Sequence, residues 1–301
     1  MSKGINLSMK EKTRETFTAY IFLLPVIIGW LIWFFYPALQ SFLISFQEFN
    51  FITPEKNHYI GLGNYLELFK DTYFYQALGH SAVLVLVIVP IQTIAALLIA
   101  LGLNSNIKGK GIFRTIYYLP YVISPVAVTT VFMYFFVQGT AVTKVFSLLG
   151  IENVTWFADM KLALPFLAII YVWQMIGFYM VIYLSGLQTI PADLYEAANI
   201  DGANGLKKFR YITLPMLKPV TFLVLTYGMI QAFQMFDQVA AVARQGMLGS
   251  PAGATHTLVS FFYMNSFKYM NMGYGSAAAI VLFLLIFLVT LIQKKLVGSE
   301  D

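Results

Sequence analysis

Cysteine is absent from this chain of 301 residues, and charged side chains account for only 11% of it. Without cysteine the chain cannot form disulfide bonds, thiolate metal sites or lipid attachments at cysteine. The three histidines, His58, His80 and His256, do not have the spacing of a metal-binding helix, so we expect no metal site. No segment has the glycine pattern of a phosphate-binding loop, and no group of residues indicates a catalytic centre. We therefore expect a protein without enzymatic activity and without a cofactor of its own.

Hydrophobic residues, in contrast, make up 59% of the chain, and its mean hydropathy of +0.72 exceeds the range of soluble domains. Several charge-free runs can hold the roughly 20 apolar residues that a helix needs to cross about 30 Å of hydrocarbon. Helices are expected because each satisfies its own backbone hydrogen bonds in lipid, and because these runs are too long for barrel strands. We predict an all-α, polytopic membrane protein with six transmembrane helices, at Phe17–Phe46, Gln76–Asn104, Thr115–Val137, Leu162–Gln188, Leu217–Val242 and Tyr274–Lys294.

Basic residues are distributed unevenly between the two sides of this predicted membrane domain. Thirteen of the 19 Lys and Arg residues lie near the two termini or in the loops after the second and fourth helices, and six lie in the other loops. Because basic residues concentrate in cytoplasmic loops, we expect both termini in the cytoplasm. The net charge of +5 then reflects topology, so no nucleic-acid partner is expected. Residues 1–15 are predicted to be a cytoplasmic tail, and residues 16–298 one transmembrane domain in contact with lipid.

The loop between the fourth and fifth predicted helices, residues 191–215, is polar and rich in helix-forming residues, unlike the rest of the chain. It predicts a short first helix with an apolar face formed by Leu194, Ala197 and Ala198. Asp201-Gly202 is a turn signal, and a second short helix is predicted after it, ended by Leu214-Pro215. A loop of this size can be a solvated connector, but its position on the cytoplasmic side also allows it to be presented to a partner.

The residues of this loop resemble the EAA loop of ABC-importer permeases, most closely those of the carbohydrate-uptake branch that includes maltose permeases. The segments that carry the resemblance are Glu196-Ala197-Ala198, Asp201-Gly202-Ala203, Phe209, Ile212, Leu214-Pro215 and Pro219. Other segments similar to these permeases are Phe22–Pro25, Gly61–Tyr65, Tyr118–Pro120, Phe236-Asp237 and Gly273–Ala277. One departure follows Phe236-Asp237, where the Thr-x-Gly-Gly-Pro run of these permeases is replaced by Val242–Met247. The departure leaves the contact with an external binding protein open.

The resemblance implies a type I ABC-importer permease fold and a permease subunit that imports a carbohydrate through the cytoplasmic membrane of a bacterium or archaeon. It implies four kinds of partner: a second homologous permease, an ATPase dimer that binds ATP and magnesium, an extracellular or periplasmic solute-binding protein, and the carbohydrate. By position, the residues that would couple this chain to the ATPase are Glu196, Ala197, Ala198, Asp201, Gly202 and Ala203. The main alternative is an ion-coupled secondary transporter, which would need ionisable residues at mid-membrane.

Two stripes of aromatic and amide side chains in the fourth and fifth helices suggest a solute pathway. The spacing places each stripe on one helix face, and the stripes are Tyr171, Gln174 and Phe178, and Tyr227, Gln231 and Gln234. At 1.5 Å per residue, Gln174 and Gln231 lie at a similar depth, roughly 22–24 Å from the cytoplasmic ends of their helices. Aromatic rings and amides suit a neutral sugar. The alternative is that the amides hydrogen-bond neighbouring helices and the rings only pack.

Overall fold

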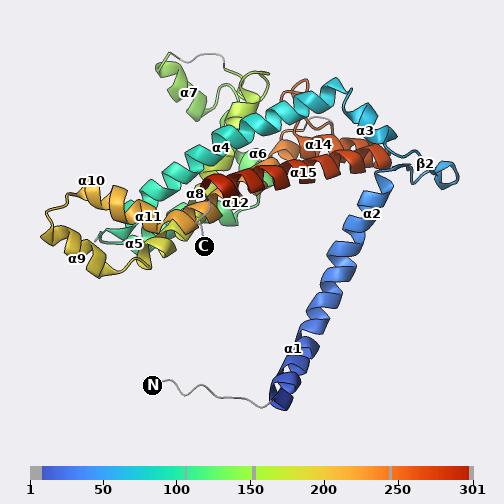
Figure 1. Ribbon diagram of the computed structural model, residues 1–301. Helices are drawn as coiled ribbons and strands as arrows, with labels where there is room; N and C mark the ends of the chain where they lie inside the picture. The colour runs from blue at the N-terminus through green and yellow to red at the C-terminus, as the bar shows by residue number, and fades with distance from the viewer. Residues whose placement is uncertain (1–8, 106, 151–153, 244–245, 298–301) are drawn as a thin grey trace.

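The computed structural model describes residues 9–105, 107–150, 154–243 and 246–297, and its long helices run between two distinct ends (Figure 1). One end carries the antiparallel hairpin of β1 (Gln47–Glu48) and β2 (His58–Tyr59), followed by α3 (Gly63–Leu68). The opposite end carries α9 (Ala192–Ile200) and α10 (Gly205–Lys208), as all three ribbon views show. The basic residues predict that the first end is the outer one and the second the cytoplasmic one, and the two ends are named accordingly below.

The first predicted span is a nearly continuous helix that projects from the rest of the molecule (Figure 1). It consists of α1 (Met9–Trp30), the π-helical turn η1 (Leu31–Phe35) and α2 (Tyr36–Ile44). None of its most apolar 18 residues is buried within the chain, and contact with the other spans is made by α2 against α15 (Met272–Val297). Of the predicted tail, residues 1–8 lie outside the described residues, and α1 already begins at Met9.

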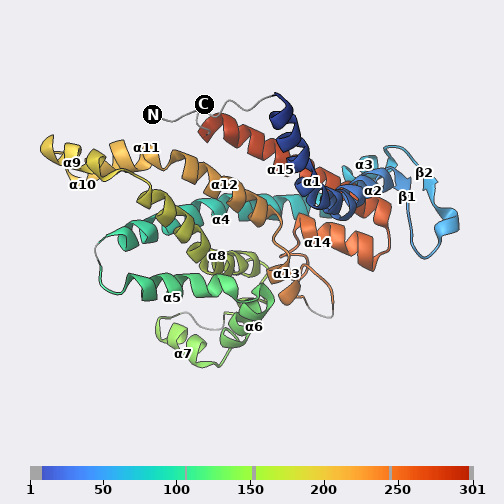
Figure 2. The same cartoon turned by 90° about the horizontal axis from the view of Figure 1, so that it is seen from below.

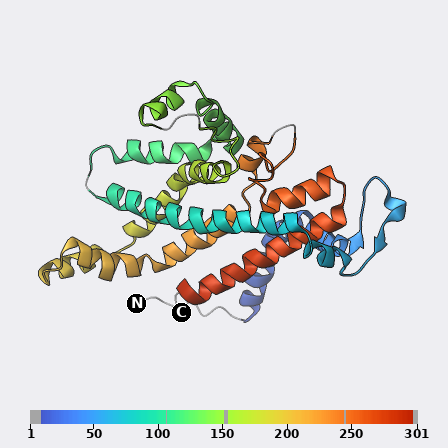
Figure 3. The ribbon, with the colours of Figure 1, turned by 90° about the horizontal axis from the view of Figure 1, so that it is seen from above.

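The centre of the molecule is built on α4 (Thr72–Asn104) and α8 (Ala163–Gln188), which share the most extensive helix contact (Figure 3). Helix α12 (Lys218–Phe233) packs against α4, and α5 (Lys110–Val122) packs against α8. A glycine permits the second contact, because a Cβ atom at Gly177 would collide with the backbone carbonyl of Tyr117. Small residues let helices approach closely where lipid provides no hydrophobic drive.

The third predicted span, Thr115–Val137, is not one helix, and that prediction is wrong in this respect. Helix α5 ends at Val122, α6 (Pro125–Phe135) begins three residues later, and the two are bent by 96° (Figure 2). Pro125 lacks a backbone N–H and disfavours helical dihedrals at the residue before it. Ser124 accordingly adopts φ −51° and ψ 129°. Among the described residues, five helices are long and apolar enough to cross a membrane, or six if this bent pair is one span. The all-α fold with six spans is confirmed in that sense.

Further short elements connect the long helices. They are α7 (Ala141–Leu148), α13 (Asp237–Ala241), α14 (Leu258–Tyr263) and the π-helical turn η4 (Met264–Lys268). The fifth predicted span therefore contains two helices, because α12 ends at Phe233 and α13 follows. Of the departing run Val242–Met247, residues 244 and 245 lie outside the described residues.

Hydrogen bonds fasten the segment before α14 to helix α4. The Ser81 hydroxyl accepts from the backbone N–H of Leu258 at 2.9 Å, and Nδ1 of His80 donates to the carbonyl of His256 at 2.9 Å. The hydroxyl of Ser260 lies 2.8 Å from Nδ1 of His256. Burial lowers the pKa of His256, the nearby His80 lowers it further, and Asp71 opposes the shift. Residues 254–260, which we call the outer loop, are therefore attached to α4, and the lowered pKa favours the neutral form of His256 at this attachment.

Candidate functional site

The cytoplasmic loop forms a compact helical hairpin around Gly202. Helix α9 ends in a Schellman motif, in which the N–H of Ala203 bonds the carbonyl of Ala198 at 2.8 Å and that of Gly202 bonds the carbonyl of Asn199 at 3.1 Å. The motif needs a left-handed residue, and Gly202 has φ +73°. Asn204 then caps α10 by accepting from the N–H of Lys207 at 2.9 Å. The two short helices predicted on either side of Gly202 are present.

The second of these helices does not end at Leu214-Pro215, so that boundary was predicted wrongly. It continues through a π-helical turn (Phe209–Thr213) and α11 (Leu214–Met216), and α12 begins at Lys218. Pro215 stands in the first turn of α11, where its missing N–H is tolerated, and the wider π-helical turn precedes it. Helix α10, the π-helical turn, α11 and α12 therefore form a nearly continuous helical element.

Two side-chain contacts hold α9 against this element. The hydroxyls of Tyr195 and Thr213 are 2.9 Å apart, and the ammonium group of Lys208 donates to the side-chain oxygen of Asn199. Tyr195 and Ile212 also pack against the buried cluster that contains Leu187, so α9 is attached to the ends of α8 and α12.

The other faces of the hairpin are open. Glu196, Ala197, Asp201 and Gly202 are exposed, whereas Ala198 and Ala203 are half-buried. Apolar side chains are exposed as well: Ile200 is 87% exposed and Leu206 is 75% exposed. Of the predicted apolar face, Leu194 and Ala197 are exposed and Ala198 turns partly inward. Exposed apolar residues between charged ones are typical of a surface that a partner covers.

The structure brings part of the two predicted pathway stripes together. The rings of Phe178 on α8 and Tyr227 on α12 have centroids 5.4 Å apart, and Tyr121 of α5 stacks on Phe178 at 4.7 Å. Tyr171 is buried, Gln231 is half-buried, and Gln234 is exposed at the C-cap of α12. Sequence reasoning missed Tyr121, although its neighbour Tyr118 in the same tyrosine-rich segment was noted. The result is an aromatic group contributed by three helices.

Gln174 is fully buried beside the break between α5 and α6. Its side-chain amide donates to the carbonyl of Ile123 at 2.9 Å, and its oxygen accepts from the amide of Gln238 on α13 at 3.1 Å. The break leaves the carbonyl of Ile123 without an intrahelical partner, which is costly in hydrocarbon. Gln174 therefore joins α8, the break and α13 in one hydrogen-bonded unit. Gln238, buried like Gln174, was not singled out from the sequence, although an amide in an apolar span is a usable signal.

A second buried amide lies where α4 meets α12. Gln92 is fully buried and faces the hydroxyl of Tyr179 without a well-formed hydrogen bond. A Cβ atom at Gly228 would lie 2.5 Å from the side-chain nitrogen of Gln92, so a larger residue there would require the Gln92 amide to move.

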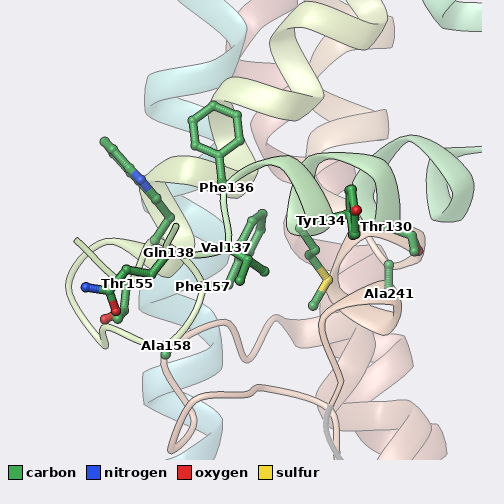
Figure 4. A pocket seen from close by; sticks show the side chains of 11 residues that line it. Thr130, Tyr134, Phe136, Val137, Gln138, Thr155, Phe157, Ala158 and Ala241 are labelled. Atoms are coloured by element: carbon green, nitrogen blue, oxygen red, sulfur yellow. The ribbon is translucent and has the colours of Figure 1, made fainter. Parts of the chain in front are cut away.

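A hollow of about 520 Å³ opens at the outer end, between α6, the loop before α8 and α13 (Figure 4). Thr130 and Ala241 lie at one side of it, and Gln138 and Thr155 at the other. The full lining is Thr130, Met133, Tyr134, Phe136, Val137, Gln138, Thr155, Trp156, Phe157, Ala158 and Ala241. None of the predicted pathway residues belongs to it. No group of His, Cys, Asp or Glu suited to a metal ion occurs among the described residues.

Comparison with known proteins assigns the family. The binding-protein-dependent transport system inner membrane component family matches residues 92–298. The arabinooligosaccharides transport system permease protein AraP of Bacillus subtilis (strain 168) is 34% identical over 286 residues, covering 93% of this chain and 88% of the relative. The trehalose/maltose transport system permease protein MalF of Thermococcus litoralis is 34% identical over 292 residues, covering 96% of this chain and 97% of the relative.

Solved structures show the same fold. A crystal structure of a bacterial ABC transporter involved in the import of the acidic polysaccharide alginate contains a chain that superposes with a TM-score of 0.82 at 22% identity. The match covers 96% of this chain and 97% of that one. The protein is therefore a multi-pass membrane subunit and belongs to the family of binding-protein-dependent transport system inner membrane components, the permeases of ABC importers.

Proposed function

We propose that this chain is one permease of an ATP-driven importer that carries a carbohydrate across the cytoplasmic membrane of a bacterium or archaeon. The observation that carries the proposal is the exposed hairpin of α9 and α10, which projects beyond the membrane helices of a chain with no nucleotide-binding motif of its own. The names of AraP and MalF support carbohydrate as the solute class. An ion-coupled secondary transporter is not favoured, because the family imports with the help of a binding protein.

The partners that we propose follow from surfaces that this chain leaves open. The hairpin would dock on an ATPase dimer, which binds ATP and magnesium, through Glu196, Ala197, Ala198, Asp201, Gly202 and Ala203. A second homologous permease would complete the pathway, and a solute-binding protein would deliver the carbohydrate on the outer side. The exposed apolar surface of α1 would contact lipid.

The contacts of the hairpin suggest how movement of the ATPase reaches the membrane. Tyr195 bonds Thr213, which leads through α11 into α12, and α9 follows directly on the end of α8. A displacement of α9 would therefore act on α8 and α12 together. These two helices carry the aromatic and amide stripes, so the same movement would change the pathway between them. Such coupling of ATP hydrolysis to alternating access is the mechanism that we propose.

For the pathway we propose that Phe178, Tyr227 and Gln231 contact the solute, together with Gln234 at the outer end of α12. Tyr171 and Gln174 would stand behind them, because both are almost fully buried. The replacement Gln231→Ala is expected to slow uptake by the assembled transporter without changing the amount of complex. Unchanged uptake in both Gln231→Ala and Gln234→Ala would contradict this part of the proposal.

The docking surface is tested by the double replacement Glu196→Lys and Gly202→Asp, with Glu55→Lys in the β1–β2 hairpin as a control. The double variant is expected to insert in the membrane normally but to lose copurification with the ATPase and to lose uptake. Glu55→Lys reverses an exposed charge at the opposite end of the molecule, and it is expected to copurify with the ATPase. A double variant that inserts, copurifies with the ATPase and transports like the unmodified protein would refute the role of the hairpin.

A further inference from the structure

The outer hollow has a lining that suits a neutral, hydroxyl-bearing ligand. Its residues include three aromatic phenyl or indole rings, Phe136, Trp156 and Phe157, and the phenol ring of Tyr134. Hydroxyls of Thr130 and Thr155 and the amide of Gln138 stand at the sides (Figure 4). Among the residues that the structure describes, no Lys, Arg, Asp or Glu lines the hollow. Flat rings with a few hydrogen-bonding groups match the apolar faces and the hydroxyl edges of a sugar ring.

The size of the hollow is in the range of small-ligand sites. Its volume of about 520 Å³ lies within the roughly 300–1,000 Å³ that such sites occupy. The rings behind it are held rigidly, because Trp156 packs on Phe166 with centroids 5.1 Å apart and on Phe136 at 5.8 Å. The hydroxyl of Thr130 already donates to the carbonyl of Val126 at 2.7 Å, so its oxygen remains available as an acceptor.

The two helices that enclose the hollow are also the helices that Gln174 joins. Helix α6 begins at the break whose carbonyl Gln174 binds, and α13 carries Gln238, which donates to Gln174. Thr130 and Ala241 face the hollow from these same two helices. A ligand between α6 and α13 would therefore displace the chain at the break between α5 and α6. Through Gln174 it would also displace α8.

We propose that this hollow is an outer receiving subsite for one or two units of a neutral saccharide, separate from the stripe between α8 and α12. The proposal rests on the carbohydrate import proposed above and adds the place where the solute first meets this chain. Occupancy separates α6 from α13, and the amides of Gln174 and Gln238 transmit that change to the break in the third span.

The first test reads binding at Trp156 directly. In the assembled transporter, Trp30, Trp33 and Trp173 are replaced by Phe so that Trp156 is the only tryptophan of this chain, and tryptophans of the partner subunits are replaced likewise. Maltotriose and arabinotriose are then titrated without the binding protein. A saturable change in Trp156 emission is expected, and the double replacement Thr130→Val and Thr155→Val is expected to raise the half-saturating concentration about tenfold, the effect of losing two hydrogen bonds. The control is Thr53→Val, which replaces a threonine of the β1–β2 hairpin.

An acyl chain is the competing occupant, and phospholipids with brominated tails distinguish it. Quenching of Trp156 by these lipids without any response to the saccharides would overturn the proposal. So would a saccharide response that the two threonine replacements leave unchanged.

The second test measures uptake. Tyr134→Ala is expected to slow saccharide uptake at least fivefold, whereas Tyr73→Ala, which removes a similarly exposed outer tyrosine, is expected to leave uptake unchanged. Sugar uptake by the unmodified transporter with no response of Trp156 and no effect of Tyr134→Ala would overturn the subsite and leave the proposed function standing. A Trp156 response in a transporter that takes up no sugar would support the subsite and refute the proposed function.

Discussion

Gln174 shows how a single buried amide can determine the local geometry of this membrane domain. Its two polar ends satisfy a backbone carbonyl at a helix break and the amide of a second glutamine, and both glutamine side chains are buried. Hydrogen bonds of this kind define one arrangement of the helices because the unpaired alternative is costly. The stripe on α8 therefore combines a structural residue, Gln174, with Phe178, which belongs to the aromatic group.

The replacement Gln174→Leu is expected to lower the stability of the purified transporter. It leaves the carbonyl of Ile123 and the amide of Gln238 unpaired, at a cost of about 1–3 kcal/mol for each group. A lower melting temperature measures the effect. Gln188→Leu, which alters an exposed amide at the end of the same helix, is the matched control and should melt like the unmodified protein. If Gln174→Leu loses uptake at unchanged stability, Gln174 acts on the solute instead.

Sequence reasoning located Gln174 but could not assign its partner. An amide in an apolar run is conspicuous in any sequence, since polar groups are expensive in hydrocarbon. The carbonyl of Ile123 needs a donor only because the chain leaves the helix there, and every residue has a carbonyl. Backbone partners of this type become visible only when the tertiary structure is known.

At the scale of the elements, the hairpin of α9 and α10 is the part that the sequence predicted best. A local signal suffices there, because Asp201-Gly202 predicts the turn that separates the two short helices. The third span was predicted less well, because its hydropathy is continuous across Ser124-Pro125 while the backbone is not. Hydropathy reports that a segment prefers lipid, and it does not report its direction.

The replacement Gly202→Ala tests the turn of the hairpin. A side chain at φ +73° costs roughly 1–2 kcal/mol, so the end of α9 should fray. Hydrogen–deuterium exchange is expected to rise at the N–H groups of residues 201–203, and the coupling of ATP hydrolysis to uptake is expected to weaken. Gly205→Ala is the matched control, because Gly205 has no left-handed backbone and no atom near an added Cβ. Equal exchange in the two variants would rule out the requirement for glycine at position 202.

The outer loop offers a prediction about pH. Because the pKa of His256 is lowered in the folded protein, the folded loop binds a proton less readily than the detached loop does. Its attachment to α4 should therefore be fully stable above the ordinary histidine pKa of about 6.5 and should weaken as the pH falls below it. Hydrogen exchange of residues 254–260, corrected for the intrinsic rate, should accelerate on acidification in the unmodified protein. His256→Gln should abolish this acceleration, and an unchanged acceleration in that variant would assign it to another group.

At the scale of the whole molecule, the loops that carry the basic residues should all lie at one of the two ends of the structure. The loop after α4 and the hairpin of α9 and α10 lie at one end, and the hairpin of β1 and β2 lies at the other (Figure 3). The loop after α4 and the hairpin of α9 and α10 carry basic residues that predict the cytoplasmic side. Sequence alone predicted this division because charge bias is a property of whole loops and does not depend on packing.

The orientation can be tested cleanly because the chain has no cysteine. A single cysteine is introduced at Lys56, exposed in the outer hairpin, or at Ser105, exposed after α4. A membrane-impermeant maleimide is expected to label Lys56→Cys in intact cells, and to label Ser105→Cys only after the membrane is opened. Each protein must first be shown to support uptake, so that the labelled molecules are folded ones. Labelling of Ser105→Cys in intact cells would invert the topology. The α9–α10 hairpin would then face away from any cytoplasmic ATPase, and the coupling role proposed for Glu196 and Gly202 would fail with it.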